Sequence, residues 1–115
     1  MKDSPLITKS KTFALNVLFV CKQLRTTKCE PVLINQFIRS GTSIGANIRE
    51  AFYAHGRADF ISKLQIALKE CYETEYWIEL LLDGGYYDNS DIQEQCIEIK
   101  KMLIASITTA KENTK

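Results

Sequence analysis

The sequence has few of the residues from which catalytic and metal sites are usually built. It contains one histidine, His55, and no pair of cysteines has the spacing of a metal-binding or redox motif. A di-iron site in a helical bundle needs a Glu-x-x-His motif on two helices, and this motif is absent. A catalytic histidine would also need a nucleophile as its partner, and no signature supplies one. We therefore expect no enzymatic activity, no metal and no cofactor.

Long apolar runs and a strong excess of one charge are also missing. No run approaches the ~20 residues that a membrane span needs, and the N-terminal residues lack the apolar core of a signal peptide. With 15 Lys and Arg against 14 Asp and Glu, the net charge of +1 gives no general argument for nucleic-acid binding. The 115 residues and 45% hydrophobic content are typical of one globular domain, covering 1–115, which we expect in the cytoplasm and not in a membrane.

The four cysteines predict little chemistry. Cys21, Cys71 and Cys96 each fall on an apolar helical stripe, so we expect buried, reduced thiols that behave as small apolar residues. Cys29 falls in a loop between two helical segments, where its thiol could be exposed.

What the sequence does contain is helical periodicity along almost its whole length. Apolar residues recur at every third or fourth position, and no segment shows the sustained alternation of a strand. Pro31 suits the first position of a helix, Gly84-Gly85 suits a helix end, and Ser90-x-x-Gln93 has the form of a capping box. Short connections between helices favour an up-down-up-down antiparallel four-helix bundle, an all-α fold. The predicted helices cover about 9–26, 31–54, 57–82 and 90–112.

Two glycines inside the second predicted helix indicate a close approach by another helix. Gly41 and Gly45 lie among apolar residues at helical spacing, where each glycine costs about 1 kcal/mol relative to alanine. We expect them to allow close helix packing, and the candidate partners are small residues of the third helix: Ala67, Cys71 and Thr74. The pair is no phosphate loop, since the Gly-Lys-Ser/Thr ending is missing.

A polar stripe and a group of aromatic residues suggest contact surfaces. Beside the apolar stripe of the second helix lies a polar one, which predicts a more polar contact surface: Arg39, Ser43, Asn47 and Glu50. On the third helix Tyr72, Tyr76 and Trp77 flank the core positions. Aromatic residues with a polar tip are enriched at interfaces, so we expect core packing for Trp77 and subunit contact for Tyr76. Helices two and three would then supply much of the contact surface.

Charge is distributed unevenly along the chain. Residues 70–98 contain nine acidic residues and no Lys or Arg, whereas residues 4–29 contain five basic residues and no acid. Antiparallel folding would gather basic residues at one end of the bundle: Lys9, Lys11, Arg49, Arg57, Lys111 and Lys115. The opposite end would be acidic and would hold Glu79, Asp83, Asp88, Asp91 and Glu94. These residues are either solvated faces that aid solubility, or the basic ones form a surface for RNA, DNA or an acidic partner.

The middle of the chain resembles a known family. The resemblance is carried by Arg39-x-x-x-Ser43-Ile44-x-x-Asn47-Ile48-x-Glu50-Ala51, then Asp59-Phe60, Leu64-x-Ile66-Ala67-Leu68 and Glu73-x-Glu75-Tyr76-Trp77. These motifs are similar to those of the bacterial four-helix-bundle proteins encoded by intervening sequences in 23S ribosomal RNA genes. The specific part of the match is residues 37–82, and the first and last helices match in pattern.

The resemblance implies a fold, an assembly and a class of partner. It implies an antiparallel four-helix bundle that forms ring-shaped homopentamers. It also implies a relation to the accessory protein of diversity-generating retroelements, a pentamer that works with a reverse transcriptase and RNA through a basic surface. The polar positions that the resemblance marks as a network or subunit interface are Arg39, Ser43, Asn47, Glu50, Glu73 and Glu75. Among them, Arg39 could pair with a glutamate of the third helix.

Two hypotheses about function follow from these patterns. The first is a non-enzymatic oligomer with RNA or another nucleic acid bound at its basic end. The alternative is a protein–protein adaptor, for example for a reverse transcriptase or polymerase, that makes no contact with nucleic acid.

Overall fold

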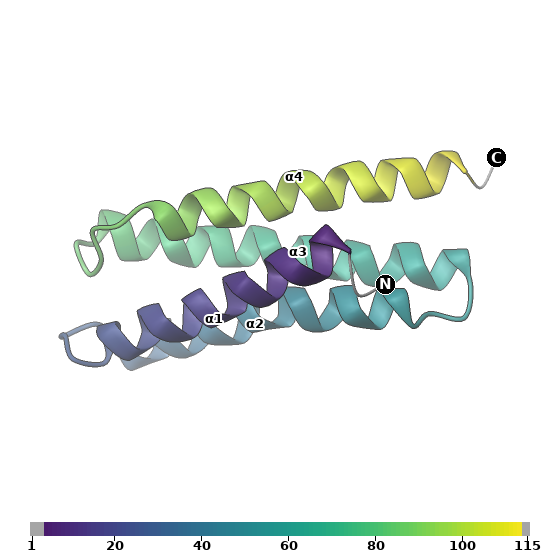
Figure 1. The fold of residues 1–115 in the computed structure, drawn as a ribbon. Helices are drawn as coiled ribbons and strands as arrows, with labels where there is room; N and C mark the ends of the chain where they lie inside the picture. The colour runs from purple at the N-terminus through teal and green to yellow at the C-terminus, as the bar shows by residue number, and fades with distance from the viewer. Residues whose placement is uncertain (1–3, 114–115) are drawn as a thin grey trace.

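Four α-helices run alternately up and down a bundle, so that each helix is antiparallel to the next (Figure 1). The computed structural model describes residues 4–113, and no strand occurs between these residues. The all-α, antiparallel four-helix bundle expected from the periodicity is therefore confirmed. Within the same range, no helix is long and apolar enough to cross a membrane. The helices are α1 (Pro5–Leu24), α2 (Pro31–Phe52), α3 (Arg57–Asp83) and α4 (Asp91–Glu112).

Proline begins both of the first two helices. Pro31 stands at the start of α2, and Pro5 stands at the start of α1. Because proline has a fixed φ suited to the first helical position and needs no N–H bond there, α1 begins four residues before the expected Lys9. The added turn contributes Leu6 to the core, where its side chain is buried.

Glycine fixes the end of α3. Gly85 has a φ of 78°, in the left-handed region that favours glycine. The Gly85 N–H donates to the Leu82 carbonyl at 3.1 Å, and the Tyr86 N–H donates to the Leu81 carbonyl at 3.0 Å. These two bonds form a Schellman motif, which satisfies carbonyls that the end of the helix would otherwise leave unpaired.

The capping box expected at the start of α4 does not form. Ser90 precedes the first residue of α4, but its side chain makes no capping hydrogen bond. Its ψ of 1° differs from the extended backbone that a capping serine adopts. Instead, Asn89 Oδ1 accepts a hydrogen bond from the Asp91 N–H at 2.9 Å.

Each helix packs against two neighbours, and the core lies between all four. The helices in contact are α1–α2, α2–α3, α3–α4 and α1–α4, so α1 and α3 lie diagonally across the bundle. The large side chains that are fully buried come from every helix and include Phe13, Phe37, Leu64, Ile78 and Leu103. Full burial of one such side chain stabilises the fold by about 1.5–3 kcal/mol.

The last turns of α4 extend past the beginning of α1 (Figure 1). Two polar contacts fix the stagger of these helices: Asn16 Nδ2 donates to Gln95 Oε1 at 2.8 Å, and Lys9 Nζ lies 3.2 Å from Glu98 Oε2. Beyond these contacts α1 soon reaches its first residue, whereas α4 continues to Glu112. The end of the bundle at the α2–α3 turn is therefore less completely covered than the middle.

All four cysteines are buried free thiols. Cys29 is only 5% exposed, so an exposed loop thiol is wrong for this position. Its N–H donates to Thr27 Oγ1 at 3.1 Å, a local bond that holds the α1–α2 turn in a compact form. Cys71 and Cys96 face each other between α3 and α4, and each Sγ lies 3.6–3.7 Å from the carbonyl oxygen of the other residue.

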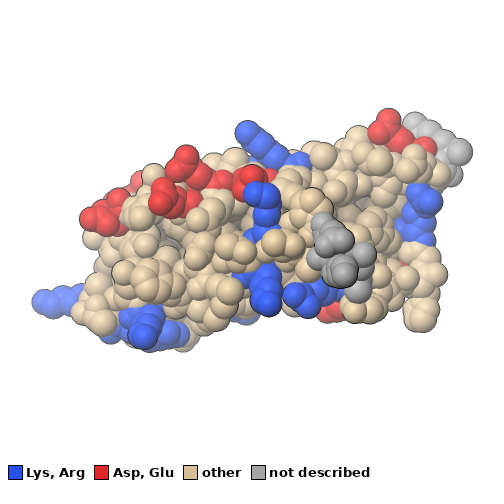
Figure 2. Space-filling view, in the orientation of Figure 1, with Lys and Arg blue, Asp and Glu red and all other residues tan. Residues whose placement is uncertain are grey.

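At the end of the bundle that holds the α1–α2 and α3–α4 turns, charge is sorted by side. The acidic residues expected at one end lie on α3, α4 and the turn between them, but the α1–α2 turn shares this end. The end of α1 and that turn add exposed Lys22, Arg25 and Lys28. Figure 2 accordingly shows acidic atoms over the α4 side and basic atoms over the α1 side. The end that the sequence predicts to be acidic is therefore a mixed surface with separated charges.

Candidate functional site

The two glycines of α2 lie on the face that packs against α1. A Cβ added at Gly41 would stand 2.9 Å from Val17 Cγ2, and a Cβ at Gly45 would stand 3.3 Å from Ser10 Oγ. Both distances are shorter than an ordinary contact between such atoms. A Cβ at Gly41 would collide with Val17, whereas a Cβ at Gly45 would require only a small shift of the Ser10 hydroxyl. The expectation that small residues of α3 approach these glycines is wrong, because the neighbour here is α1.

Small residues of α3 do meet α2, but at another position. The hydroxyl oxygens of Ser40 and Thr74 lie 2.8 Å apart in the buried interior. Thr74 Oγ1 also donates to the Glu70 carbonyl of its own helix at 2.7 Å. On the buried face of α2, Gly41 and Gly45 therefore lie against α1, and Ser40 lies against α3.

Arg39 pairs with two glutamates of α3. Its Nη1 lies 3.0 Å from Glu70 Oε2, and its Nη2 donates to Glu73 Oε1. The hydrogen bond to Glu73 raises the pKa of Arg39. Burial tends to raise the pKa of Glu73, but the hydrogen bond and charge of Arg39 outweigh it, and the pKa lies below its usual value. Arg39 thus joins α2 to α3 at the surface of the bundle.

The next polar residues of α2 bond within their own helix. Ser43 Oγ donates to the Arg39 carbonyl at 2.6 Å, and Asn47 Nδ2 donates to the Ser43 carbonyl at 2.9 Å. Such bonds return a polar side chain to the turn before it. Neither side chain reaches α3 in the described chain.

Glu50 and Glu75 take part in separate pairs. Glu50 Oε1 lies 3.2 Å from Lys63 Nζ, between α2 and α3. Glu75 lies on the opposite side of α3 and receives hydrogen bonds of 2.9 and 3.0 Å from Lys100 Nζ of α4. The bond to Glu75 raises the pKa of Lys100, whose Nζ is also 5.5 Å from the centre of the Tyr72 ring.

The six polar residues of the family motif therefore form several small groups and not one network. Sequence reasoning missed three partners, which are Glu70, Lys63 and Lys100. Glu70 could have been found, because it lies three residues before Glu73 and so shares a helix face with it. Lys63 and Lys100 could not, since helical spacing shows which residues share a face but not which face meets a neighbouring helix.

Two apolar stripes point away from the core on diagonal helices. The first, called the α1 stripe, consists of Leu15, Leu18 and Phe19, and the Phe19 side chain is 60% exposed. The second, called the α3 stripe, consists of Tyr72, Tyr76 and Leu80, and Tyr76 is 53% exposed. Positions three and four residues apart share a helix face, so each stripe is a continuous surface.

Charges of opposite sign accompany the two stripes. Lys11 and Lys22 share the outer face of α1 with the α1 stripe. Glu79 and Asp83 flank the Leu80 end of the α3 stripe, whereas Lys69 and Lys100 lie near its Tyr72 end. Trp77 lies beside the α3 stripe, with its ring centre 5.2 Å from that of Tyr76. Its Nε1 is buried without a hydrogen bond of ordinary geometry, but it lies close enough to the Glu73 carboxylate to help lower the pKa of Glu73.

The cations expected to contact nucleic acid have different surroundings. Lys9 is held by Glu98 of α4, whereas Lys11 and Arg49 are exposed on α1 and α2. Arg57 begins α3, and Lys111 lies in the last turn of α4. Lys115 lies outside the described residues.

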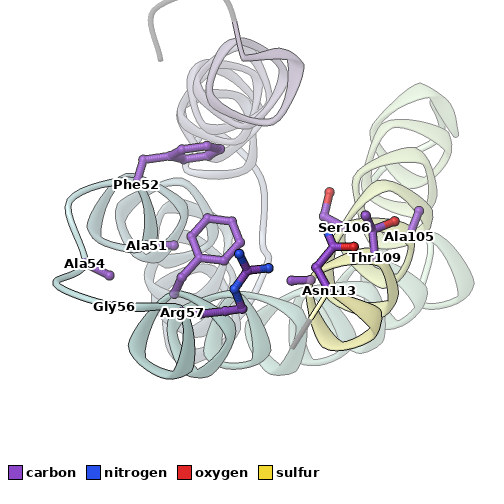
Figure 3. A pocket seen from close by; sticks show the side chains of 11 residues that line it. Ala51, Phe52, Ala54, Gly56, Arg57, Ala105, Ser106, Thr109 and Asn113 are labelled. Carbon is purple, nitrogen blue, oxygen red and sulfur yellow. The ribbon is translucent and has the colours of Figure 1, made fainter. Parts of the chain in front are cut away.

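A cavity of about 630 Å³ opens at the end of the bundle where α1 is short. The end of α2, the start of α3 and the last turns of α4 form its walls (Figure 3). Arg57 projects into it from the start of α3, opposite Ser106, Thr109 and Asn113 of α4 (Figure 3). Among residues 4–113, no three His, Cys, Asp or Glu side chains come together as a group that could hold a metal ion.

Most of the chain matches one protein family. The profile of the 23S rRNA-intervening sequence proteins matches residues 2–105. The chain is also similar to a solved structure, a protein of unknown function from the S23 ribosomal protein family of Bacteroides thetaiotaomicron VPI-5482. The two share 48% sequence identity with a TM-score of 0.85, over 89% of this chain and 97% of that one. No curated protein matches the chain significantly. The chain belongs to the 23S rRNA-intervening sequence protein family.

Proposed function

We propose that the chain assembles with copies of itself into a closed ring, a homopentamer, and that this ring is a non-enzymatic protein that binds RNA. The observation that carries the assembly is the pair of outward-facing stripes on α1 and α3. Soluble monomers rarely leave contiguous apolar surface in water, and such surface often marks an interaction site. Aromatic residues such as Phe19 and Tyr76 are typical anchors of protein interfaces.

The two stripes are complementary and not identical. The α1 stripe is accompanied by lysines and the Leu80 end of the α3 stripe by Glu79 and Asp83, so the α1 stripe of one copy would fit this part of the α3 stripe of the next. The contact surface is thus assigned to α1 and α3, in place of the second and third helices suggested by the sequence pattern.

The positions of the stripes favour a ring. Because α1 and α3 lie diagonally across the bundle, a contact between them joins two different surfaces. Such heterologous contacts form a closed ring or an open filament, depending on the rotation between copies. The chain belongs to the 23S rRNA-intervening sequence protein family, and its resemblance to this family implies a pentamer. This supports a closed ring over an open filament.

The RNA contact is placed at the end that holds the α2–α3 turn. Arg49 and Arg57 lie at this end, and neither makes an ion pair with a described acidic residue. Repetition around a ring would multiply these contacts, since linked sites bind with a high effective concentration. A protein close to neutral overall could in this way bind a polyanion.

Light scattering across a concentration series tests the assembly. We expect the parent chain to exceed its monomer mass of 13.1 kDa severalfold. Phe19→Glu should dissociate the pentamer, because a carboxylate would replace an aromatic side chain that the assembly buries and would lie opposite Glu79 and Asp83 of the next copy. Ile104→Glu is the matched control, since Ile104 is also exposed but lies on α4 outside both stripes. A parent chain that remains monomeric at high micromolar concentration would contradict the proposal.

Retention of structured rRNA fragments at several salt concentrations tests the second part. Binding through phosphates should weaken steeply as salt rises, with a slope that reflects the number of contacts. Exchange of both Arg49 and Arg57 for glutamine should reduce retention and the slope. No retention at low salt would reject RNA binding and favour the alternative of an adaptor for another protein.

A further inference from the structure

The cavity at the α2–α3 turn combines three kinds of chemistry in one place. Its lining contains two aromatic rings, three uncharged polar side chains and a single charged group. The volume of about 630 Å³ falls within the roughly 300–1,000 Å³ of typical ligand pockets. None of the other hollows described on residues 4–113 joins aromatic rings to an arginine in this way.

The aromatic part is formed by Phe52 of α2 and Phe60 of α3. Their ring centres are 5.6 Å apart and their planes are inclined by 79°, an edge-to-face arrangement. Both side chains are half-buried, so each still presents ring surface to the cavity. A planar ligand can pack against such a surface with little loss of side-chain freedom.

The polar part lies on α4. Ser106, Thr109 and Asn113 line the cavity, and within residues 4–113 their side chains make no hydrogen bond with one another or with the rest of the chain. Ser106 differs from the other buried or half-buried serines and threonines of the helices in that its hydroxyl makes no hydrogen bond to a described residue. In the described helices, the buried or half-buried serine and threonine hydroxyls other than Ser106 all bond protein atoms: Ser10, Ser40, Thr42, Ser43 and Thr74. Hydrogen-bonding capacity is therefore available where α4 faces the cavity.

The charged part is Arg57, the one ionised residue in the lining. It stands at the start of α3, and the preceding Gly56 has no side chain to cap the first N–H groups of that helix. A helix N-terminus and a guanidinium both favour an anion, and arginine binds phosphate oxygens through two parallel N–H bonds. The cavity is thus suited to a ligand with one anionic group beside a flat apolar body.

We propose that this cavity binds a nucleoside monophosphate unit, either as a free nucleotide or as an unpaired nucleotide of an RNA strand. The base would pack on Phe52 and Phe60, its polar edge would bond the side chains of α4, and its phosphate would pair with Arg57. An aliphatic acid would use Arg57 but would make no use of the aromatic rings or of the polar side chains of α4. The inference rests on the proposed function in that it gives RNA binding at this end of the bundle a definite site.

Calorimetric titration of the assembled protein with adenosine 5′-monophosphate tests the inference. We expect saturable binding, weaker binding of adenosine and no detectable binding of inorganic phosphate alone. Arg57→Gln should weaken binding of the nucleotide roughly 10- to 100-fold through loss of a charge-assisted bond. Phe60→Leu, which keeps an apolar side chain but removes the ring, should weaken it roughly 5- to 100-fold through loss of stacking. Lys101→Gln is the control, since Lys101 is exposed on α4 and does not line the cavity, and should bind as the parent does.

The outcomes separate this inference from the proposed function. Nucleotide binding that is absent at millimolar concentration, or unchanged in both cavity variants, overturns the inference even if rRNA fragments are retained. Nucleotide binding without retention of RNA supports the cavity site and rejects the RNA-binding function. Binding seen only with the dissociated Phe19→Glu variant also overturns it, because another copy of the chain would then cover the cavity in the assembled protein. An RNA tetranucleotide with one abasic position distinguishes the sources: a strand-bound base is supported if the abasic strand binds more weakly.

Discussion

Gly41 of α2 lies against Val17 of α1 so closely that a Cβ at Gly41 would stand 2.9 Å from Val17 Cγ2 and 3.1 Å from Val17 Cγ1. Both methyl groups of the valine therefore face the backbone of the glycine. Val17 is fully buried, and a valine in a helix is almost confined to one χ1 rotamer. Neither side of this contact can move away easily.

Gly41→Ala is expected to destabilise the fold. Alanine is favoured over glycine in a helix by about 1 kcal/mol, but overpacking a core typically costs about 1–3 kcal/mol. The clash should prevail, and the free energy of unfolding measured with urea should fall by up to about 2 kcal/mol. Combining Gly41→Ala with Val17→Ala should recover part of this loss, so that the double variant is less destabilised than the sum of the single variants.

Gly45→Ala is the matched control on the same face of α2. Its Cβ would stand 3.3 Å from Ser10 Oγ, and a serine hydroxyl can rotate to relieve the contact. Helix propensity should then prevail, and the unfolding free energy should stay the same or rise by up to about 1 kcal/mol. Equal losses at Gly41 and Gly45 would show that Val17 is not the cause.

Gly85→Ala should weaken the end of α3. With a φ of 78°, Gly85 adopts a conformation that costs a residue with a Cβ roughly 1–2 kcal/mol. Thermal unfolding should show a lower midpoint for this variant. Neither Gly84 nor Gly56 has a positive φ, so alanine avoids the left-handed conformation at both positions. Only at Gly56 does the added Cβ meet open space, so Gly56→Ala is the better control. A loss at Gly56 as large as the loss at Gly85 would contradict the role of the left-handed conformation.

Much of the fold could be predicted because the apolar spacing, the prolines and the Gly84-Gly85 pair all act locally. Errors arose where a boundary depended on less local geometry. Pro5 extends α1 beyond the expected start, and the Ser90 backbone leaves the cap to Asn89. Periodicity shows that a helix has a buried face, but it does not show how far the helix continues beyond its strongest apolar positions.

The partners of the predicted site residues were less accessible from sequence. Arg39 was expected to pair with a glutamate of α3, and the structure places Glu73 there, but Glu75 faces α4 instead. One residue along a helix turns a side chain by about 100°, so two positions send Glu75 toward a different neighbour. The cavity could not have been predicted at all, because it depends on the stagger between α1 and α4.

Arg39→Gln should lower stability at neutral pH and have little effect in acid. The folded-state pKa of Glu73 is depressed, so its contribution is present above the unfolded pKa and is lost as the pH falls through the folded one. Arg39 is half-exposed, which limits the expected loss to about 1 kcal/mol or less at pH 7. In urea unfolding, the curves of the parent and of Arg39→Gln should therefore differ at pH 7 and coincide at pH 3.

Asp88→Asn provides the control for that experiment, since Asp88 is exposed in the α3–α4 turn and makes no ion pair with a described cation. Its unfolding curve should follow the parent at both pH values. A difference between parent and Arg39→Gln that persists at pH 3 would mean that packing of the arginine stem, and not its charge, stabilises the contact.

The cysteines should be unreactive in the folded protein and should make stability fall in alkaline solution. Burial raises the pKa of Cys21 to about 11, and the contact with Cys71 together with burial raises the pKa of Cys96. The thiolate is the reactive form, so an aromatic disulfide reagent at pH 8 should react slowly until denaturant is added.

In the unfolded chain a thiol loses its proton near pH 8.5, whereas in the folded chain Cys21 keeps it to about pH 11, so the unfolding free energy should fall with rising pH between these values. Cys21→Ala should have a shallower slope in urea unfolding over that range, and an unchanged slope would contradict the assignment to Cys21.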